Sequence, residues 1–421
     1  MCKIIDLIII DKYHDRLVTS NLQFAYKENH STSMCTTVLK EVCSYYVSRG
    51  SDVYICLLDA SKAFDRVHYG KLFDLLKSRN IPVLVRRLLL DMYTRQKLET
   101  VWNGKHSESF CAANGVKQGG ILSPLLFCVY FDELLLKINQ SGLGCHVGHL
   151  SYAGIGYADD VTTAAPSMTA LQSIICLCEE FGREYDVLWN WKKSKCIKIG
   201  GNGVAPRRNI ILNGKALKWK NKVEHLGHKL RYDLSDYDDI MSKKGSFISQ
   251  VNKLNVQFKT VPSLLKGKLL QTYCASWYGC QIWDLDSNMV QAMQTEWNKA
   301  VRRTLKIPYQ THRNLLPLIV KSRTFEDQHF KRVSKFVNSI VESENEHLAF
   351  IGERAKSYSH GSLGRNYRRC MDKTVNDRQN PELLSIAQSI CELLEVRDGQ
   401  RVIPGLSRLD VHEMIEYLCC C

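Results

Sequence analysis

The spacing of apolar residues over the first hundred positions predicts several helices and one buried strand. Apolar residues recur at helical intervals over residues 4–26 and 33–49, a period typical of helices with one buried face. Residues 53–58 form a continuous apolar run, Val-Tyr-Ile-Cys-Leu-Leu, which is typical of a strand buried on both faces. Helical spacing returns over residues 69–79 and 82–95.

Alternating and β-branched patterns then join the helical ones. Residues 98–112 resemble a hairpin around an Asn-Gly turn, and residues 154–163 resemble a strand, a turn and a second strand. Apolar and amphipathic helices are predicted over residues 123–139 and 168–185, and from residue 238 the spacing is helical to the end. The pattern therefore predicts an α+β protein, with an antiparallel sheet and a helical region after it.

Composition and charge restrict the class of protein and favour an anionic partner. Hydrophobic residues make up 45% of the 421 residues and charged residues 24%, which are globular values and exclude wholesale disorder. Lys and Arg number 57 against 43 Asp and Glu, a net charge of +14. Residues 183–231 alone carry thirteen basic and three acidic residues. This surplus favours a polyanion, although an acidic protein or a membrane surface also satisfies it.

The cysteines and the apolar runs predict an intracellular protein, nuclear or cytoplasmic, without membrane attachment. The cysteine count, seventeen, is odd, and no CxxC pair provides zinc-ligand spacing. Free thiols in a reducing compartment are therefore expected. Asp6 interrupts the first apolar run, whereas a secretory signal needs an unbroken apolar centre. The longest later run, residues 121–131, is too short to span a bilayer.

Three acidic residues are the first candidates for chemistry. Asp59 directly follows the predicted strand over 53–58, and Asp159-Asp160 occupies the predicted turn between two strands. A carboxylate at the end of an apolar strand is costly unless it is paired or binds a cation. If the strands are neighbours, the carboxylates form a cluster suited to two Mg²⁺ ions about 4 Å apart, which can act on a phosphorus centre. The alternative is that Asp-Asp is simply a favourable turn pair.

Sequence blocks around these acids resemble those of one enzyme family, and they occur in that family's order. They are LLDASKAFD at 57–65, YADD at 157–160, GVKQGGILSP at 115–124, QFAYK at 23–27 with Ser31-Thr32, NWKKSK at 190–195, HLG at 225–227 and SWYGCQIW at 276–283. One such block matches by chance easily, but a whole series of them in order does not. The chain resembles the reverse transcriptases of non-LTR, LINE-type retrotransposons. Intron-encoded and telomerase enzymes share the central blocks, but the YG and Trp residues of the last block favour the LINE group.

The resemblance implies a right-hand polymerase fold. Its parts would be partial fingers (1–50), an α/β palm with the catalytic aspartates (51–200), a basic primer-grip-like segment (201–237), a helical thumb (238–330) and a C-terminal helical region (331–421).

The resemblance also implies roles in catalysis. Asp59, Asp159 and Asp160, with the Ala60 carbonyl, would hold two Mg²⁺ ions, for which Mn²⁺ is a possible substitute. Phe64 would lie under the sugar of the incoming dNTP and exclude a 2′-hydroxyl; the alternative is core packing.

Two further pairs of residues are implied to contact the nucleotide. Gln118 and Gly119 would lie against nucleotide and template, with an ordinary loop as the alternative. Either Lys193 or Lys195 would neutralise the leaving pyrophosphate, or both belong to a solvated basic face.

The implied partners are an RNA template, a DNA primer and dNTP; no membrane is implied, and the oligomeric state is left open. Lys27 of the QFAYK block, and His225, Leu226 and Gly227 of the HLG block, would contact nucleic acid. A groove formed by Trp277, Tyr278, Trp297, Arg302 and Arg303 is a further expectation, with core packing of the aromatic residues as the alternative.

The sequence departs from the family pattern in ways that affect the expected activity. Ala25 stands where the family has Gly, Lys27 where it has Arg, and the early Arg-Pro-Ile block has no counterpart. We therefore expect an N-terminally truncated copy, in which the metal site is retained and nucleotide binding is weakened. Two functions follow: an RNA-directed DNA polymerase, or a nucleic-acid-binding relic that retains the acids only by descent.

Overall fold

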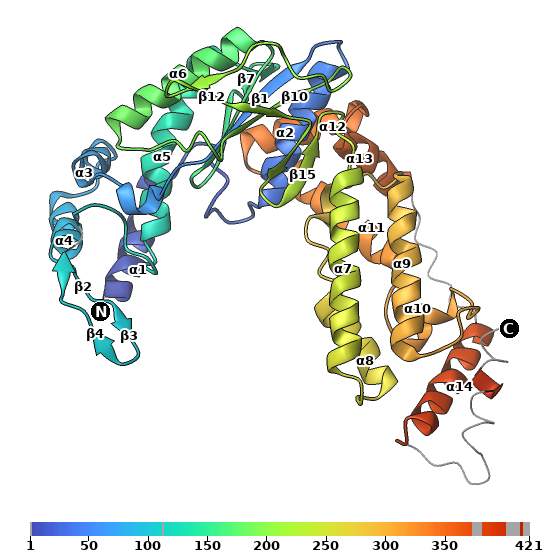
Figure 1. Ribbon diagram of the computed structural model, residues 1–421. Coiled ribbons are helices and arrows are strands. Elements are labelled where there is room, and N and C mark those ends of the chain that lie inside the picture. Colours follow the sequence, from blue (N-terminus) through green and yellow to red (C-terminus); the bar gives the residue numbers. More distant parts are fainter. Residues whose placement is uncertain (1, 112, 373–380, 401–412, 416–421) are drawn as a thin grey trace. The chain divides into compact units, whose positions relative to one another are not determined.

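The computed structural model describes residues 2–111, 113–372, 381–400 and 413–415, and it divides into two compact units (Figure 1). The first unit comprises residues 1–234 and 340–354, and the second comprises residues 235–339 and 355–421. Residues 340–354 therefore belong to the first unit, whereas the sequence predicts one continuous C-terminal region over 331–421.

A five-stranded sheet forms the centre of the first unit. Its strand order is β13 (Lys218–Lys220), β10 (Lys195–Ile199), β1 (Val53–Leu58), β9 (Asp160–Ala165) and β8 (Gly154–Tyr157). All neighbouring strands are antiparallel except the pair β10 and β13. The predicted strand over 53–58 and the predicted strand–turn–strand over 154–163 are confirmed, as is the mixed α+β class.

Helices pack against this sheet. They are α2 (Thr32–Val47), which contacts β1 and β8, α5 (Ser123–Gln140), which contacts β8, and α6 (Met168–Glu184), which contacts β1 and β9. Local signals define their starts. The Ser31 hydroxyl accepts a hydrogen bond from the Met34 amide, and the Ser167 hydroxyl accepts one from the Ala170 amide; both are side-chain N-caps. Helix α5 begins with a proline in its first turn, where a missing amide hydrogen costs nothing.

The first unit also contains two further helices and several short strands outside the central sheet. These are α3 (Tyr69–Ser78), α4 (Val83–Thr94), and the strands β2 (Lys97–Leu98), β3 (Val101–Trp102), β4 (Lys105–His106), β5 (Phe110–Cys111), β6 (His146–Val147), β7 (Leu150–Ser151), β11 (Ile211–Leu212), β12 (Lys215–Ala216), β14 (Lys222–His225) and β15 (His228–Arg231). Strands β3 and β4 pair around Asn103-Gly104, where both residues have positive φ. The predicted hairpin is therefore confirmed.

The prediction of a helix over residues 4–26 is wrong after its first half. Helix α1 spans Cys2–Tyr13, and a short 3-10 turn, His14–Arg16, ends the helical segment. The chain then runs beside β8: the Phe24 amide donates to the Gly156 carbonyl, and the Gly156 amide donates to the Leu22 carbonyl. Apolar spacing alone could not reveal this, because the backbone partner lies more than 130 residues away.

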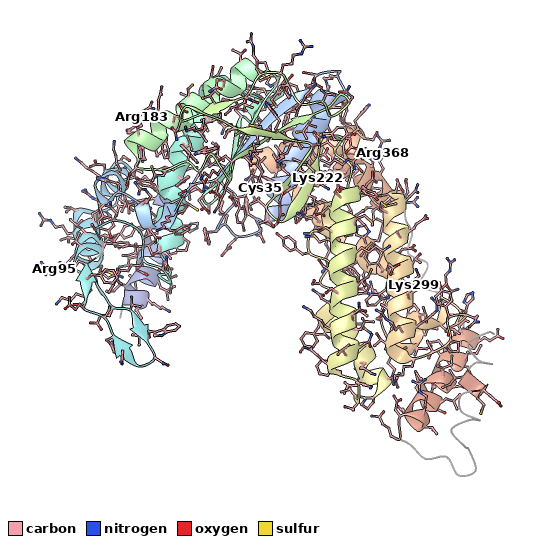
Figure 2. The ribbon with its side chains drawn as sticks, in the orientation of Figure 1. Cys35, Arg95, Arg183, Lys222, Lys299 and Arg368 are labelled. Carbon is pink, nitrogen blue, oxygen red and sulfur yellow. The ribbon has the colours of Figure 1, made fainter. Side chains whose placement is uncertain are left out.

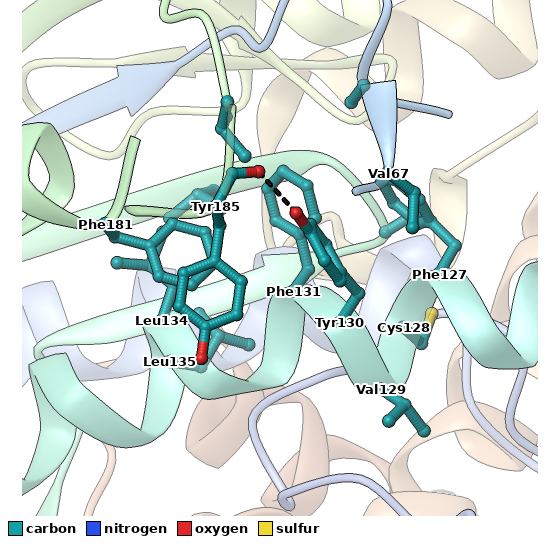
Figure 3. Packing of buried hydrophobic residues seen from close by; sticks show 14 of the residues in the cluster. Val67, Phe127, Cys128, Val129, Tyr130, Phe131, Leu134, Leu135, Phe181 and Tyr185 are labelled. Atoms are coloured by element: carbon teal, nitrogen blue, oxygen red, sulfur yellow. Dashed lines mark hydrogen bonds between the residues drawn. The ribbon is translucent and has the colours of Figure 1, made fainter. Parts of the chain in front are cut away.

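Aromatic side chains fill the space between α5 and α6. Phe127 and Phe131 of α5 stack with their ring centroids 4.8 Å apart, and Phe131 meets Phe181 of α6 edge-on at 6.1 Å. The Tyr130 hydroxyl donates to the Tyr185 carbonyl, the dashed contact in Figure 3. Such interlocked rings bury much apolar area and give the sheet a rigid support.

Every secondary-structure element among the described residues of the second unit is helical. Its principal elements are α7 (Tyr237–Gln257), α8 (Ser263–Leu269), a π-helical segment (Leu270–Cys274), a 3-10 turn (Cys280–Ile282), α9 (Asn288–Leu305), α10 (Leu315–Ile319), α11 (Phe325–Val341), α13 (Ser362–Asp372) and α14 (Pro381–Arg397). Helix α12 (Glu346–Ser357) begins within residues 340–354, which belong to the first unit. None of the described helices has the length and apolar character needed to cross a membrane.

Trp277 and Trp297 belong to the core of the second unit. Both are buried, and the Phe247 ring lies 4.6 Å from the Trp277 ring and 5.9 Å from the Trp297 ring, measured between centroids. Of the two interpretations of these aromatic residues, core packing is therefore confirmed. Tyr278 and Arg303 are exposed and remain open to an outside partner. Arg302 is half-buried, and its guanidinium donates to the Thr311 carbonyl.

We expect Phe131→Ala to lower the free energy of unfolding by about 3–5 kcal/mol, because it leaves a cavity among rings that cannot collapse into it. Urea denaturation of the full chain measures this change. The matched control is Phe110→Ala, which removes a ring that is 53% exposed and should change the free energy by less than about 0.5 kcal/mol. Equal effects of the two substitutions would contradict this description of the core.

Candidate active site

Strand pairing brings the three aspartates to one end of the sheet. Leu58, the last residue of β1, pairs with Val161 of β9, so Asp59 lies one step beyond, at the level of Asp160. Tyr157 and Asp160 close the hairpin between β8 and β9 and leave Ala158 and Asp159 as its two-residue turn. The arrangement depends on the register, since a slip of one residue would turn Asp160 to the other face of the sheet.

The carboxyl groups of these residues affect one another. Burial, followed by the charges of Asp159 and Asp59, raises the pKa of Asp160 to about 6. Burial, followed by the charge of Asp59, raises the pKa of Asp159. Asp160 is nevertheless exposed by its accessible surface, so solvent screens part of this repulsion. The three groups converge, as the sequence predicts, and their mutual repulsion favours a bound cation.

The Asp59 oxygens include one that the protein leaves unsatisfied. Oδ2 of Asp59 is buried and has no hydrogen-bond partner among the described residues. Oδ1 lies 3.8 Å from the Lys193 ammonium, a partly exposed pair. A buried carboxylate oxygen without a donor is costly unless a cation binds it. The residues thus suit a hard cation, although no three Asp, Glu, His or Cys side chains in the described chain already form a complete ligand set.

The segment after β1 is fixed by backbone contacts with residues 188–194. The Asp59 carbonyl accepts from the Asn190 amide, and the Ser61 amide donates to the Leu188 carbonyl, both at 2.8 Å. These bonds lie on either side of Ala60, the residue expected to offer a carbonyl to a metal. The Asp59 amide donates in turn to the Ser194 hydroxyl at 3.1 Å. Ser194 was not singled out by the sequence, and nothing in its spacing indicates this contact.

Lys193 and Lys195 lie on this segment at different places. The Asn190 side chain accepts hydrogen bonds from the Lys192 and Lys193 amides, which holds Lys193 near Asp59. Lys195 begins β10 opposite Leu57, and its side chain is exposed. Only Lys193 is therefore shown in contact with an aspartate of the cluster.

The block around Phe64 and the block around Gln118 lie side by side. The Val116 amide donates to the Phe64 carbonyl at 2.9 Å, and the Gln118 side-chain amide donates to Asp65 at 3.2 Å. A side chain at Gly115 would place its Cβ 2.9 Å from the Asp65 backbone. Gly119 is exposed, with φ near +80°. The two blocks thus pack against each other, a contact that their spacing in the sequence does not predict.

Phe64 has both a packed and an accessible side. Its ring stacks on Phe127 with centroids 3.8 Å apart and planes 10° apart, and the residue is half-buried. The packing interpretation is thereby confirmed for one face of the ring. The contact also fixes the ring's orientation, which a steric gate requires, so the gate stays a prediction.

A cavity of about 250 Å³ lies beside Asp160. Its lining combines the ends of β1 and β9 with the turn between β14 and β15: Leu57, Leu58, Asp160, Val161, Thr162, Glu224, His225, Leu226 and Gly227. Leu226 and Gly227 have positive φ and form the two-residue turn. The structure thus brings the HLG block beside Asp160, about 65 residues earlier in the sequence.

His225 itself is a buried anchor. It is 4% exposed, and its Nδ1 lies 2.8 Å from the Thr36 hydroxyl of α2. Burial, followed by the neighbouring His228, lowers the pKa of His225 to about 3. His225 thus holds the turn at 226–227 against α2, and contact of this block with nucleic acid stays a prediction.

Lys27 is likewise held inside the unit. Its ammonium group donates to the carbonyls of Thr19 (3.0 Å) and Ser20 (2.6 Å). Burial lowers the pKa of Lys27, and the nearby Asp132 carboxylate opposes this effect only in part. These contacts give Lys27 a structural role, and a phosphate contact by Lys27 stays a prediction.

The basic segment presents most of its charge to solvent. Of its thirteen Lys and Arg residues, ten are exposed: Arg183, Lys192, Lys193, Lys195, Arg207, Arg208, Lys215, Lys218, Lys220 and Lys222. Arg183 and Lys222 are labelled in Figure 2. Exposed cations of this kind are what a non-specific contact with a phosphate backbone requires.

Comparison with protein families gives a match over more than half of the chain. The model described as "Reverse transcriptase (RNA-dependent DNA polymerase)" matches residues 1–230.

Three relatives illustrate the likeness to single proteins. The Pol polyprotein of the type-2 retrotransposable element R2DM of Drosophila melanogaster is 29% identical over 163 residues, which are 39% of this chain and 15% of that protein. The RNA-directed DNA polymerase from mobile element jockey of Drosophila funebris is 27% identical over 205 residues, 48% and 22% of the two chains. The probable RNA-directed DNA polymerase from transposon X-element of Drosophila melanogaster is 24% identical over 357 residues, 78% and 36%. The chain thus spans well under half the length of each of these relatives.

Among solved structures, telomerases show a distant likeness. The apo telomerase of Candida tropicalis aligns with a TM-score of 0.41 at 11% identity, covering 91% of this chain and 60% of that chain. The telomerase of Candida albicans in complex with a fragment of telomeric RNA aligns with a TM-score of 0.39 at 9% identity, covering 85% and 56%.

The buried His225 predicts a pH dependence of stability. Its pKa is near 6.5 in the unfolded chain and about 3 in the folded one, so the unfolded chain binds the proton first. Stability should therefore fall as pH drops from about 6.5 towards 3, by up to about 1.4 kcal/mol per pH unit for this proton. Urea denaturation between pH 7 and 4 measures the slope. His225→Gln should remove about one proton from it, and His149→Gln, at a histidine whose side chain is 72% exposed, should not. Equal slopes in all three proteins would contradict the assignment.

Proposed function

Since this chain belongs to the reverse transcriptase (RNA-dependent DNA polymerase) family, we propose that it synthesises DNA on an RNA template as the polymerase of a non-LTR retrotransposon. The reaction is nucleotidyl transfer from a dNTP to the 3′-hydroxyl of a primer, with release of pyrophosphate. The observation that carries the proposal is the convergence of Asp59, Asp159 and Asp160 at one end of the sheet, beside a cavity closed by the turn at 226–227.

The two units suit the parts of a right-hand polymerase. The sheet of the first unit, with α5 and α6, corresponds to a palm, and residues 1–50 correspond to part of the fingers. The helices of the second unit, from α7 onwards, correspond to a thumb. The aspartates would lie on a rigid support, because the sheet packs on the aromatic core of α5 and α6. A catalytic geometry needs such a support.

Asp59, Asp159 and Asp160, with the Ala60 carbonyl, would hold divalent cations, Mg²⁺ by preference and Mn²⁺ as a substitute. When bound, such ions bring the attacking hydroxyl and the leaving phosphate oxygens into line and stabilise the charge that develops on them. Two observations support this assignment: Oδ2 of Asp59 is buried without a hydrogen-bond donor, and burial, together with neighbouring carboxylates, raises the pKa values of Asp159 and Asp160. A bound cation would offset both costs.

The remaining groups would orient and select the nucleotide. Lys193, 3.8 Å from Asp59, would neutralise the leaving pyrophosphate, and Lys195, at the start of β10, is the alternative. Phe64, fixed by its stacking on Phe127, would stand against a 2′-hydroxyl. Gln118 and Gly119 would lie against the base pair being formed, at an exposed loop whose glycine allows close approach.

RNA template and DNA primer would bind along the basic surface of residues 183–231. Its ten exposed Lys and Arg side chains favour contacts with phosphates that do not read sequence. The turn at Leu226 and Gly227, beside Asp160 in the lining of one cavity, would support the primer end. Binding of this kind weakens steeply as salt rises.

The first test is primer extension on an RNA template with Mg²⁺. We expect the full chain to extend the primer, and Asp159→Asn to reduce the rate at least about a hundredfold, because it removes charge where the transition state needs it. The control is Asp91→Asn, at an exposed acid that pairs only locally with Arg95, which should leave the rate unchanged. Template–primer binding without extension in the unmodified protein would instead support the nucleic-acid-binding relic.

The second test concerns the sugar. We expect Phe64→Ala to raise incorporation of ribonucleotides relative to deoxynucleotides by about tenfold or more, because it opens space for the 2′-hydroxyl. Single-nucleotide extension with dNTP and with rNTP measures the ratio. Phe73→Ala, which removes another partly buried ring packed on the same core, is the control and should keep the ratio. An unchanged ratio in Phe64→Ala would contradict the steric gate and show that Phe64 serves only in core packing.

A further inference from the structure

Gln23 lies beside the Asp159 turn, and its contacts are not explained by the roles assigned so far. The residue opens the QFAYK block, and none of it is accessible to solvent. A fully buried amide needs hydrogen-bond partners for both its oxygen and its nitrogen. Both ends of the Gln23 amide find a partner in Ala158, the residue immediately before Asp159.

The contact with Ala158 is double. The Ala158 amide donates to Gln23 Oε1 at 2.9 Å, and Gln23 Nε2 donates to the Ala158 carbonyl at 3.3 Å. Gln23 Oε1 also accepts from the Ala25 amide at 3.2 Å. The side chain thus binds both backbone groups of one turn residue, as a neighbouring strand would.

The turn needs such support. Ala158 has φ near +56°, a left-handed conformation that is unfavourable for a residue with a side chain. Ala158 is also buried, so water cannot easily satisfy its backbone groups. Local sequence provides neither glycine nor asparagine at this position, and the conformation is therefore held from outside the hairpin.

The backbone beside Gln23 is fixed to the same hairpin. The Phe24 amide and the Leu22 carbonyl both pair with Gly156, at 2.9 Å each. A Cβ at Gly156 would lie 2.7 Å from Leu135 and 3.2 Å from Gln23 Nε2, so glycine permits the close approach. Residues 22–24 and the turn therefore form one connected structure.

We propose that Gln23 is a positioning residue that holds the Ala158–Asp159 turn, and with it the Asp159 carboxyl, in the geometry that nucleotidyl transfer requires. Gln23 itself need not touch the substrate. Its kinetic consequence rests on the proposed function, but its effect on the turn does not.

The unmodified protein offers the first measurement. The hairpin of β3 and β4 also closes in two residues, and its first turn residue, Asn103, has φ near +52°, close to that of Ala158, but Asn103 is exposed. Hydrogen–deuterium exchange, resolved to single amides by mass spectrometry, compares the two. We expect the Ala158 amide to exchange at least about tenfold more slowly than the Asn103 amide, after correction for intrinsic rates. Equal corrected rates would overturn the proposal, and this measurement depends on no variant.

Two near-isosteric substitutions separate positioning from general stability. Gln23→Met keeps the length of the side chain and removes both bonds to Ala158. The control is Asn139→Leu: the Asn139 amide binds the carbonyl (2.8 Å) and the amide (3.2 Å) of Gly154, at the opposite end of β8. Each substitution thus removes a double contact from one end of the same strand. Exchange should quicken at residues 156–160 in Gln23→Met and around residue 154 in Asn139→Leu.

Kinetics then tests the consequence for Asp159. In steady-state primer extension, Gln23→Met should lower kcat about ten- to hundredfold, the scale of a small misplacement of a reacting group, and leave KM for dNTP within about twofold. Asn139→Leu should leave kcat within about twofold. An equal fall of kcat in both variants, or an unchanged kcat in Gln23→Met when exchange at 156–160 has quickened, would overturn the proposal.

The two proposals fail differently. An unmodified protein that extends no primer contradicts the proposed function, whereas exchange at Ala158 still decides whether Gln23 holds the turn.

Discussion

The antiparallel pairing of β1 with β9 places three carboxyl groups together at the end of a buried sheet, and this charge cluster is the constraint on which the first unit is organised. Desolvation and mutual repulsion raise the pKa values of Asp159 and Asp160. Such a cluster opposes folding, so its position must be maintained by favourable packing elsewhere. The aromatic contacts among α5, α6 and the sheet provide that packing.

Polar contacts from distant segments then fix the backbone on which the acids lie. Ser194 binds the Asp59 amide, Asn190 binds the Asp59 carbonyl, and Gln23 binds both backbone groups of Ala158. Each contact joins segments more than 130 residues apart. Together they hold the backbone of the strand end and of the turn more firmly than a hairpin alone could, which is how a strained and charged site retains one geometry.

Several residues that a motif alone would assign to substrate binding are buried or half-buried and have structural contacts instead. His225 and Lys27 are both polar and lie in blocks that resemble nucleic-acid-binding motifs, yet their polar groups bind Thr36 and the carbonyls of Thr19 and Ser20. Trp277 and Trp297 pack in the core of the second unit. Ten of the thirteen lysines and arginines of residues 183–231, in contrast, are exposed. Residue type indicates which chemistry is possible, and exposure decides whether a partner can use it.

The sequence alone determined the buried strand at 53–58, the strand–turn–strand at 154–163, most of the helices and the three aspartates, because each is encoded by a short-range pattern or a local motif. It also determined the basic surplus of residues 183–231. The tertiary structure alone decided that the chain after Arg16 leaves the helix to pair with β8, that Gln23 reaches Ala158, and that His225 is buried against Thr36. These contacts join residues far apart in sequence, and their formation depends on register and packing, which no local periodicity specifies.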